Sequence, residues 1–118
     1  MSNRISQCFD RAKQADRAVL GIFVSAGDPT EQASTAILDS LVENGADFIE
    51  LGMPFSDPMA DGPAIQAASL RAIKQGMTLQ GTLDMAAAFR TRHPDTPLIL
   101  MGYYNPIYMY GTDAFITA

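Results

Sequence analysis

Cysteine, histidine and tryptophan are almost missing from this chain: its 118 residues include one cysteine, one histidine and no tryptophan. A single cysteine, Cys8, excludes an internal disulfide or a cysteine-based zinc site within the chain, and it favours the reducing cytoplasm. We interpret Cys8 as a small apolar residue on a helix face. His93 stands just before Pro94, and we expect it to be a solvated residue at a helix end. One histidine gives little support to a histidine-dependent triad or a histidine-rich metal site.

Long apolar runs and clusters of basic residues are also missing. No apolar stretch approaches the roughly 20 residues of a membrane span, and the first twenty residues contain no signal-peptide core. The net charge of -5 argues against nucleic acid and anionic membrane surfaces as main partners. Because 47% of the residues are hydrophobic and 18% are charged, the composition is that of a globular domain or of part of one.

The apolar pattern predicts alternating helices and strands. We expect helices over 4–16, 28–45, 63–75 and 78–93, strands over 18–27, 47–54 and 96–106, and the first turn of another helix within 110–118. The helix over 28–45 has a clear start signal, with Asp28 as N-cap, Pro29 at the first helical position and Glu31 three residues after the cap. Thr112 is expected to cap the last helix.

This order of elements builds a parallel α/β sheet with right-handed crossovers. A flavodoxin-like doubly wound domain needs about five strands, and the pattern contains three. A (β/α)₈ TIM barrel needs about 250 residues, so the chain would hold only its first three βα units or so. The end of the chain inside a new helix favours the barrel. We expect residues 1–118 to be the N-terminal part of a single TIM-barrel domain, with no internal domain boundary.

The second strand contains an unexpected carboxylate, Glu50. Strand alternation sends Ile49 and Leu51 to the face that helices must cover, so Glu50 faces the barrel interior. An ionised carboxylate there is costly without partners. Two interpretations stay open: a structural glutamate satisfied by a buried lysine or backbone donors, or a catalytic group that gives and takes a proton.

The loop after this strand carries two more acids, and function in both candidate folds collects at such loops. Asp61 directly precedes the Gly62–Pro63 helix start, so an acid at a helix N-terminus is its plain structural role. Asp57, in Ser-Asp-Pro, is typical of a turn former. On spacing alone, these paired carboxylates are a weak signal of catalysis.

Residues of the first and third strands can complete a pocket. Met101, Tyr103 and Asn105 share one side of the third strand, and Phe23 points inward from the first. Tyrosines at the mouth of a strand suit a flat aromatic ligand, while core packing is the alternative for Met101. Together these residues predict an apolar, aromatic-lined pocket with acidic proton-handling groups and no visible phosphate cradle.

The stretch IELGMPFSDPMADGP closely resembles the signature of the tryptophan synthase alpha chain family. Supporting matches occur across almost the whole chain, in the order of the family: FVSAGDP, AIQAASLRAI and LMGYYNPIYMYG. Two departures are mild, since Ser25 stands where the family usually has threonine, and Ser69 stands where asparagine is common.

The resemblance implies a TIM-barrel lyase that splits indole-3-glycerol phosphate into indole and glyceraldehyde 3-phosphate by a retro-aldol reaction. Glu50 matches the general acid/base of the family. Asp61 matches the acid that holds the indole N–H and stabilises the positive charge. Phe23, Met101 and Tyr103 match positions that line the substrate pocket.

The resemblance also implies a partner, the tryptophan synthase beta chain, in an alpha2-beta2 complex. That partner carries pyridoxal phosphate and receives indole through a tunnel, while this chain carries neither a cofactor nor a metal. Asp57, Pro58 and Asn105 lie in loops that would meet the partner. The phosphate-binding loops of the family, near strands seven and eight, have no counterpart here, so we expect the isolated chain to be inactive.

Two alternatives remain. In the first, the chain is a non-catalytic fragment that docks to the beta chain and modulates it. In the second, it is an unrelated flavodoxin-like binding module. The second alternative requires a monomeric, cooperatively folding chain with five strands.

Overall fold

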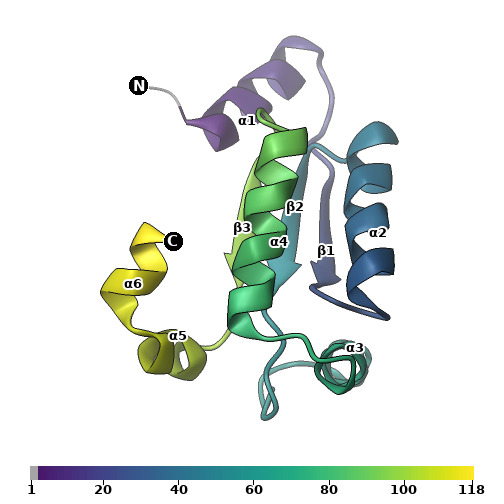
Figure 1. Ribbon diagram of the computed structural model, residues 1–118. Helices are drawn as coiled ribbons and strands as arrows, with labels where there is room; N and C mark the ends of the chain where they lie inside the picture. Colours follow the sequence, from purple (N-terminus) through teal and green to yellow (C-terminus); the bar gives the residue numbers. More distant parts are fainter. Residues whose placement is uncertain (1–2) are drawn as a thin grey trace.

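Three short parallel strands form the centre of the fold. The computed structural model describes residues 3–118, and within them it contains these three strands and six helices (Figure 1). In chain order they are α1 (Arg4–Gln14), β1 (Gly21–Ser25), α2 (Glu31–Glu43), β2 (Phe48–Gly52), α3 (Pro63–Lys74), α4 (Leu79–Arg92), β3 (Leu98–Met101), α5 (Tyr104–Tyr110) and α6 (Thr112–Thr117). The predicted α/β alternation is confirmed, and the five strands that a flavodoxin-like domain requires are not found in the described residues.

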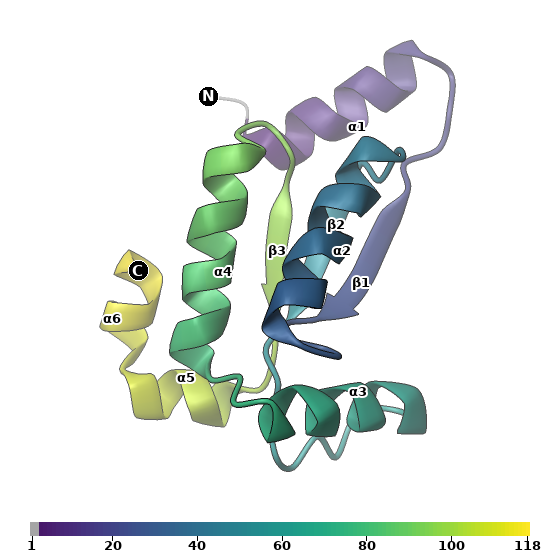
Figure 2. The same ribbon diagram turned by 45° about the vertical axis from the view of Figure 1, so that its right-hand side comes forward.

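The sheet has the order β1-β2-β3 with all pairs parallel. Helices α2 and α4 cover one face, α3 lies across the carboxyl ends of the strands, and α1 lies at their amino ends (Figures 1 and 2). Among residues 3–118, no helix packs along the opposite face. The carboxyl ends of all three strands therefore meet at one edge, beside an open sheet face.

The core lies between the sheet and the helices that cover it. Ile49 and Leu51 are both 0% exposed, and they pack with Leu38 of α2 and Phe89 of α4. Fully burying each such aliphatic side chain contributes about 1.5–3 kcal/mol. The alternation along β2 is thus as predicted: Ile49 and Leu51 face the helices, and Glu50 between them faces the open side.

The start of α2 differs from the prediction. Its N-cap is Thr30, whose hydroxyl accepts a hydrogen bond from the Ala33 N–H at 3.2 Å. The Asp28 carboxylate instead accepts two bonds from Arg71 of α3, at 2.8 and 2.9 Å. Thr30 is itself a good cap residue, and the charge-assisted pair with Arg71 gives Asp28 a stronger partner than a helix N–H.

The third strand is shorter than predicted. It ends at Met101, and the segment after Tyr103 forms helix α5, so Asn105 lies on a helix and not on a strand face. Pro106 falls in the first turn of α5, where its missing N–H has no intrahelical partner to lose. The aromatic residues of this segment favour a strand by propensity, and this misled the prediction.

Two smaller predictions at helix ends were also wrong. Thr112 is the first residue of α6, and Gly111, with φ of 103°, is its N-cap. His93 is not a solvated residue: its side chain is 16% exposed, and its Nε2 lies 2.7 Å from Asp39 Oδ1 of α2. The His93 ring also packs on Phe89, with ring centroids 4.8 Å apart. His93 therefore connects the end of α4 to α2.

Cys8 is buried on α1, in agreement with the predicted role of a small apolar residue on a helix face, and its thiol is free.

No helix in the described part of the chain has both the length and the apolar character needed to cross a membrane.

An ion pair joins the α1–β1 connection to the start of β2. Arg17 donates to both carboxylate oxygens of Asp47, each at 2.8 Å, and the Leu20 N–H donates to Asp47 Oδ2 at 2.8 Å. The Arg17 guanidinium, with help from the Leu20 N–H, lowers the pKa of the Asp47 carboxyl to about 2. The charged form of Asp47 thus stabilises the folded state.

Replacing Asp47 by Asn is expected to lower the free energy of unfolding by about 1–2 kcal/mol at pH 7, allowing for solvent screening through the exposed Arg17. Because the pKa of Asp47 is lower in the folded state, its stabilisation is complete above the unfolded value near 3.9. It is lost as the pH falls from there towards 2. Urea denaturation of the intact protein between pH 7 and pH 3 measures this.

The matched control is Asp10→Asn, on the exposed side of α1, which should change the free energy of unfolding little at any of these pH values. The difference between wild type and Asp47→Asn should shrink at acid pH. A difference that stays constant down to pH 3 would contradict the assignment.

Candidate active site

The candidate site lies on the open sheet face, near the carboxyl ends of the strands. Phe23 of β1 is the register partner of Glu50 of β2, and Met101 of β3 is the partner of Gly52. Since residues opposite each other in a parallel sheet point to the same side, Phe23 and Glu50 share the open face. Three strands thus each contribute one residue to the same surface.

Gly52 allows the Phe23 ring to lie close against the sheet. A Cβ added to Gly52 would lie 2.6 Å from Cζ of Phe23, a distance that real side chains do not reach. The missing side chain leaves room for the Phe23 ring beside Met101. Glycine at a strand end is typical of such close approaches.

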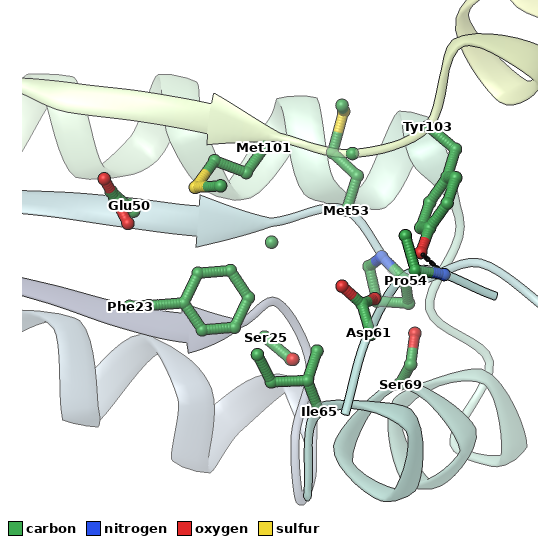
Figure 3. Close-up of a pocket in the computed structure, with 13 residues that line it drawn as sticks. Phe23, Ser25, Glu50, Met53, Pro54, Asp61, Ile65, Ser69, Met101 and Tyr103 are labelled. Carbon is green, nitrogen blue, oxygen red and sulfur yellow. Dashed lines mark hydrogen bonds between the residues drawn. The ribbon is translucent and has the colours of Figure 1, made fainter. Parts of the chain in front are cut away.

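A cavity of about 460 Å³ opens here, between the strands, the loop over 53–62 and helix α3. This volume falls in the range of small-molecule sites. All five residues predicted for catalysis or substrate binding line it: Phe23, Glu50, Asp61, Met101 and Tyr103 (Figure 3).

Glu50 projects from β2 into this cavity and is half-buried. Within residues 3–118, its carboxylate has neither a lysine partner nor a backbone donor. The structural interpretation of Glu50, which required such partners, therefore finds no support in the described residues. A carboxylate without a fixed partner remains available to a ligand in the cavity.

Asp61 approaches the cavity from the other end. Figure 3 shows Glu50 and Asp61 at opposite ends, with Phe23 and Met101 between them. Gly62 is the N-cap of α3, and no side chain caps this helix, so Asp61 directly precedes the helix without a capping bond from its carboxylate. Its main chain is fixed instead: the Asp61 N–H donates to the Pro58 carbonyl at 3.0 Å. Its half-buried side chain is left to face the cavity.

The three residues predicted to meet a partner lie outside the cavity lining. Asp57 is exposed, and its carboxylate accepts a hydrogen bond from the Ser56 hydroxyl at 2.9 Å. Its carbonyl accepts a hydrogen bond from the Met59 N–H at 2.8 Å, so its backbone takes part in a turn. Pro58 is half-buried and closes the turn to Asp61 through its carbonyl. Asn105 is exposed on α5.

Helix α3 contributes residues that the sequence prediction missed. Ser69 is 5% exposed, and its hydroxyl accepts a bond from the Phe55 N–H at 3.0 Å. Ile65, one turn before Ser69, lines the cavity. The spacing of four residues places both on one side of the helix. The signal in the sequence was a serine within a mostly apolar helix segment.

Comparisons with known proteins agree with this geometry. A family model described as the tryptophan synthase alpha chain matches residues 9–118. The tryptophan synthase alpha chain of Zymomonas mobilis subsp. mobilis is 57% identical over 113 residues, which cover 96% of this chain and 41% of that protein. The present chain thus spans about two fifths of the length of this curated relative.

Solved structures give the same result. Tryptophan synthase subunit alpha from Legionella pneumophila str. Paris matches with a TM-score of 0.93 and 43% identity, covering 98% of this chain and 44% of that one. Tryptophan synthase from M. tuberculosis, in an aminoacrylate-bound form, matches with a TM-score of 0.91 and 36% identity, covering 98% and 46%. The predicted fold is confirmed: the sheet and its helices are the first βα units of a TIM barrel. The chain belongs to the tryptophan synthase alpha chain family.

Proposed function

We propose that these residues form part of the active site of a lyase that cleaves indole-3-glycerol phosphate into indole and glyceraldehyde 3-phosphate, for tryptophan biosynthesis. In this proposal, residues 1–118 are the N-terminal part of a single TIM-barrel domain. The observation that carries it is the position of Glu50 and Asp61 on one cavity with apolar and aromatic walls. Family membership supports the same reaction.

The reaction breaks the bond between indole C3 and the glycerol chain, and it requires two proton transfers. The protonated Glu50 carboxyl donates a proton to indole C3, which places positive charge on the ring nitrogen. The resulting Glu50 carboxylate then takes the proton of the adjacent glycerol hydroxyl. As that hydroxyl carbon becomes the aldehyde, the electrons of the broken bond return to the ring and release indole. Glu50 ends in its starting protonation state, as a general acid/base must.

Asp61 is proposed to bind the indole N–H through its carboxylate. The positive charge that develops on the ring nitrogen is attracted to this anion, and the attraction is stronger in a site from which water is excluded. Phe23, Met101 and Tyr103 provide walls against which a flat ring packs. The two acids at opposite ends of the cavity thus have separate tasks.

The phosphate group of the substrate requires residues beyond those described. None of the described residues that line the cavity is basic. Since the binding energy of a remote phosphate helps to position the reacting atoms, we expect residues 1–118 alone to be inactive. The proposal therefore applies to the intact protein.

We further propose a beta-chain partner in an alpha2-beta2 complex. Asp57, Pro58 and Asn105 would contact it, and the exposure of Asp57 and Asn105 supports this. Pyridoxal phosphate belongs to the beta chain, and this chain needs no cofactor. The buried free thiol of Cys8 supports a reducing compartment, the cytoplasm.

A second candidate function is docking without catalysis. It would use the exposed Asp57 and Asn105, which lie outside the cavity lining. In that case the chain would alter the activity of a beta protein and release no indole. Mixing the isolated chain with beta protein, and assaying both reactions, distinguishes the two functions.

Replacing Glu50 by Gln in the intact protein is expected to lower kcat for indole release by at least about 10²–10⁴-fold, because the amide can neither give nor take the proton. Substrate binding should be largely retained, since the side chain keeps its size. Steady-state indole release and calorimetric binding of indole-3-glycerol phosphate measure the two effects. Glu43→Gln, on the exposed end of α2, is the control. Normal turnover by Glu50→Gln would contradict the assignment of Glu50 as the general acid/base.

Replacing Asp61 by Asn is expected to lower kcat by about 10²-fold, because the neutral amide does not stabilise the charge on the indole nitrogen. The same indole assay measures this change. Asp113→Asn, exposed on α6, should leave the rate unchanged. A wild-type rate for Asp61→Asn would show that the charge is stabilised elsewhere.

Replacing Asp57 and Asn105 together by Ala is expected to weaken binding of the intact protein to a beta chain by about tenfold, because each hydrogen bond lost from such a polar side chain costs about 0.5–1.5 kcal/mol. Titration followed by calorimetry measures the affinity. Indole release without the beta chain should not change. An unaltered affinity would place the interface on another surface.

A further inference from the structure

The loop over 53–62 carries Asp61 and has no regular secondary structure. Its backbone is nevertheless held by side chains from other elements. At its start, the Phe55 N–H donates to the Ser69 hydroxyl of α3 at 3.0 Å. At its end, the main chain of Ala60 and Asp61 is held by two side chains.

Tyr103 holds the peptide group that precedes Ala60. The Ala60 N–H donates to the Tyr103 hydroxyl at 2.9 Å, as the dashed line in Figure 3 shows. The Tyr103 ring also packs on Phe55, with ring centroids 5.3 Å apart. Tyr103 thus reaches from the segment after β3 to both ends of the loop that follows β2.

Gln66 of α3 holds the peptide group that follows Asp61. Its Nε2 donates to the Asp61 carbonyl at 2.7 Å and to the Pro58 carbonyl at 3.4 Å. Together with the bond from the Asp61 N–H to Pro58, these contacts fix the main chain of Asp61. The Asp61 carboxylate itself has no hydrogen-bond partner among residues 3–118, so its position in the cavity is set through its backbone.

We propose that Tyr103 and Gln66 are positioning residues that hold the Asp61 carboxylate in place for the reaction. The inference rests on the proposed function, and it adds a second task to the wall formed by the Tyr103 ring. A charge that stabilises a transition state must stay within about half an ångström of its productive position. Because the Asp61 carboxylate has no hydrogen-bond partner of its own, it can keep this position only if the backbone of the loop is held.

The first test is independent of activity. Tyr103→Phe keeps the ring and removes the hydroxyl, and Gln66→Met keeps the length of the side chain and removes the donor. Because Ala60 and Gln66 are exposed, water can replace the lost bonds, and the melting temperature should change little. Hydrogen exchange of the segment 54–62 should become several-fold faster in both variants. The matched controls are Tyr104→Phe and Gln32→Met, both at exposed positions.

The second test is a double-mutant cycle in the intact protein, with indole release as the readout. Each variant should lower kcat about tenfold with a change in KM of less than about threefold. In the Asp61→Asn background, the same substitutions should lower kcat less than about twofold, because the carboxylate that they position is gone. A structural role would give the same loss in both backgrounds.

Unchanged exchange of 54–62, an equal loss in both backgrounds, or wild-type kcat for both variants would each overturn the inference. A wild-type protein that releases no indole would overturn the proposed function instead, and the catalytic part of this inference with it. The exchange measurement would still decide whether Tyr103 and Gln66 hold the loop.

Discussion

The two-residue period of β2 is the constraint on which the rest of the structure depends. Ile49 and Leu51 must face the helices to form the core, and Glu50, which lies between them, must then face the opposite side. A shift of register by one residue would bury the carboxylate under α2 and α4 and expose the two aliphatic side chains. The same pattern that stabilises the fold therefore delivers an acid to the cavity, and packing and chemistry are fixed together.

The second acid reaches the cavity in a different way. Asp61 lies in a loop, where no periodic pattern determines its direction, and its placement depends on hydrogen bonds to the main chain. Those bonds come from Tyr103, which is distant along the chain, and from Gln66 of α3, the helix that follows the loop. One acid is thus placed by a strand and the other by a set of side chains around a loop. A displaced Glu50 would therefore indicate a change in strand register, and a displaced Asp61 would indicate the loss of hydrogen bonds around the loop.

The sequence alone was sufficient where a local period determines the result. The direction of Glu50, the inward Phe23 and the helix that begins at Pro63 all follow from alternation or from helix start signals, and the structure agrees. The family signature added the chemical roles, which spacing alone left open. These roles are expectations about the reaction and are separate from the placement of the residues.

Predictions failed where a distant partner decides the outcome. Asp28 is a good N-cap by every local rule, but Arg71, 43 residues later, pairs with it and leaves the cap to Thr30. His93 pairs with Asp39, 54 residues earlier, and a local pattern contains no trace of that contact. The aromatic segment after β3 has strand propensity, yet it forms a helix. Local propensity is a weak guide when tertiary contacts compete with it.

Gly52 has a consequence for the position of one wall of the cavity. The strand backbone there stands so close to the Phe23 ring that even one added carbon would collide with it. The absence of a side chain at Gly52 therefore allows the Phe23 ring to lie against the sheet and to form part of the cavity wall. A chain with alanine at this position would have to move the Phe23 ring, and the wall of the cavity would move with it.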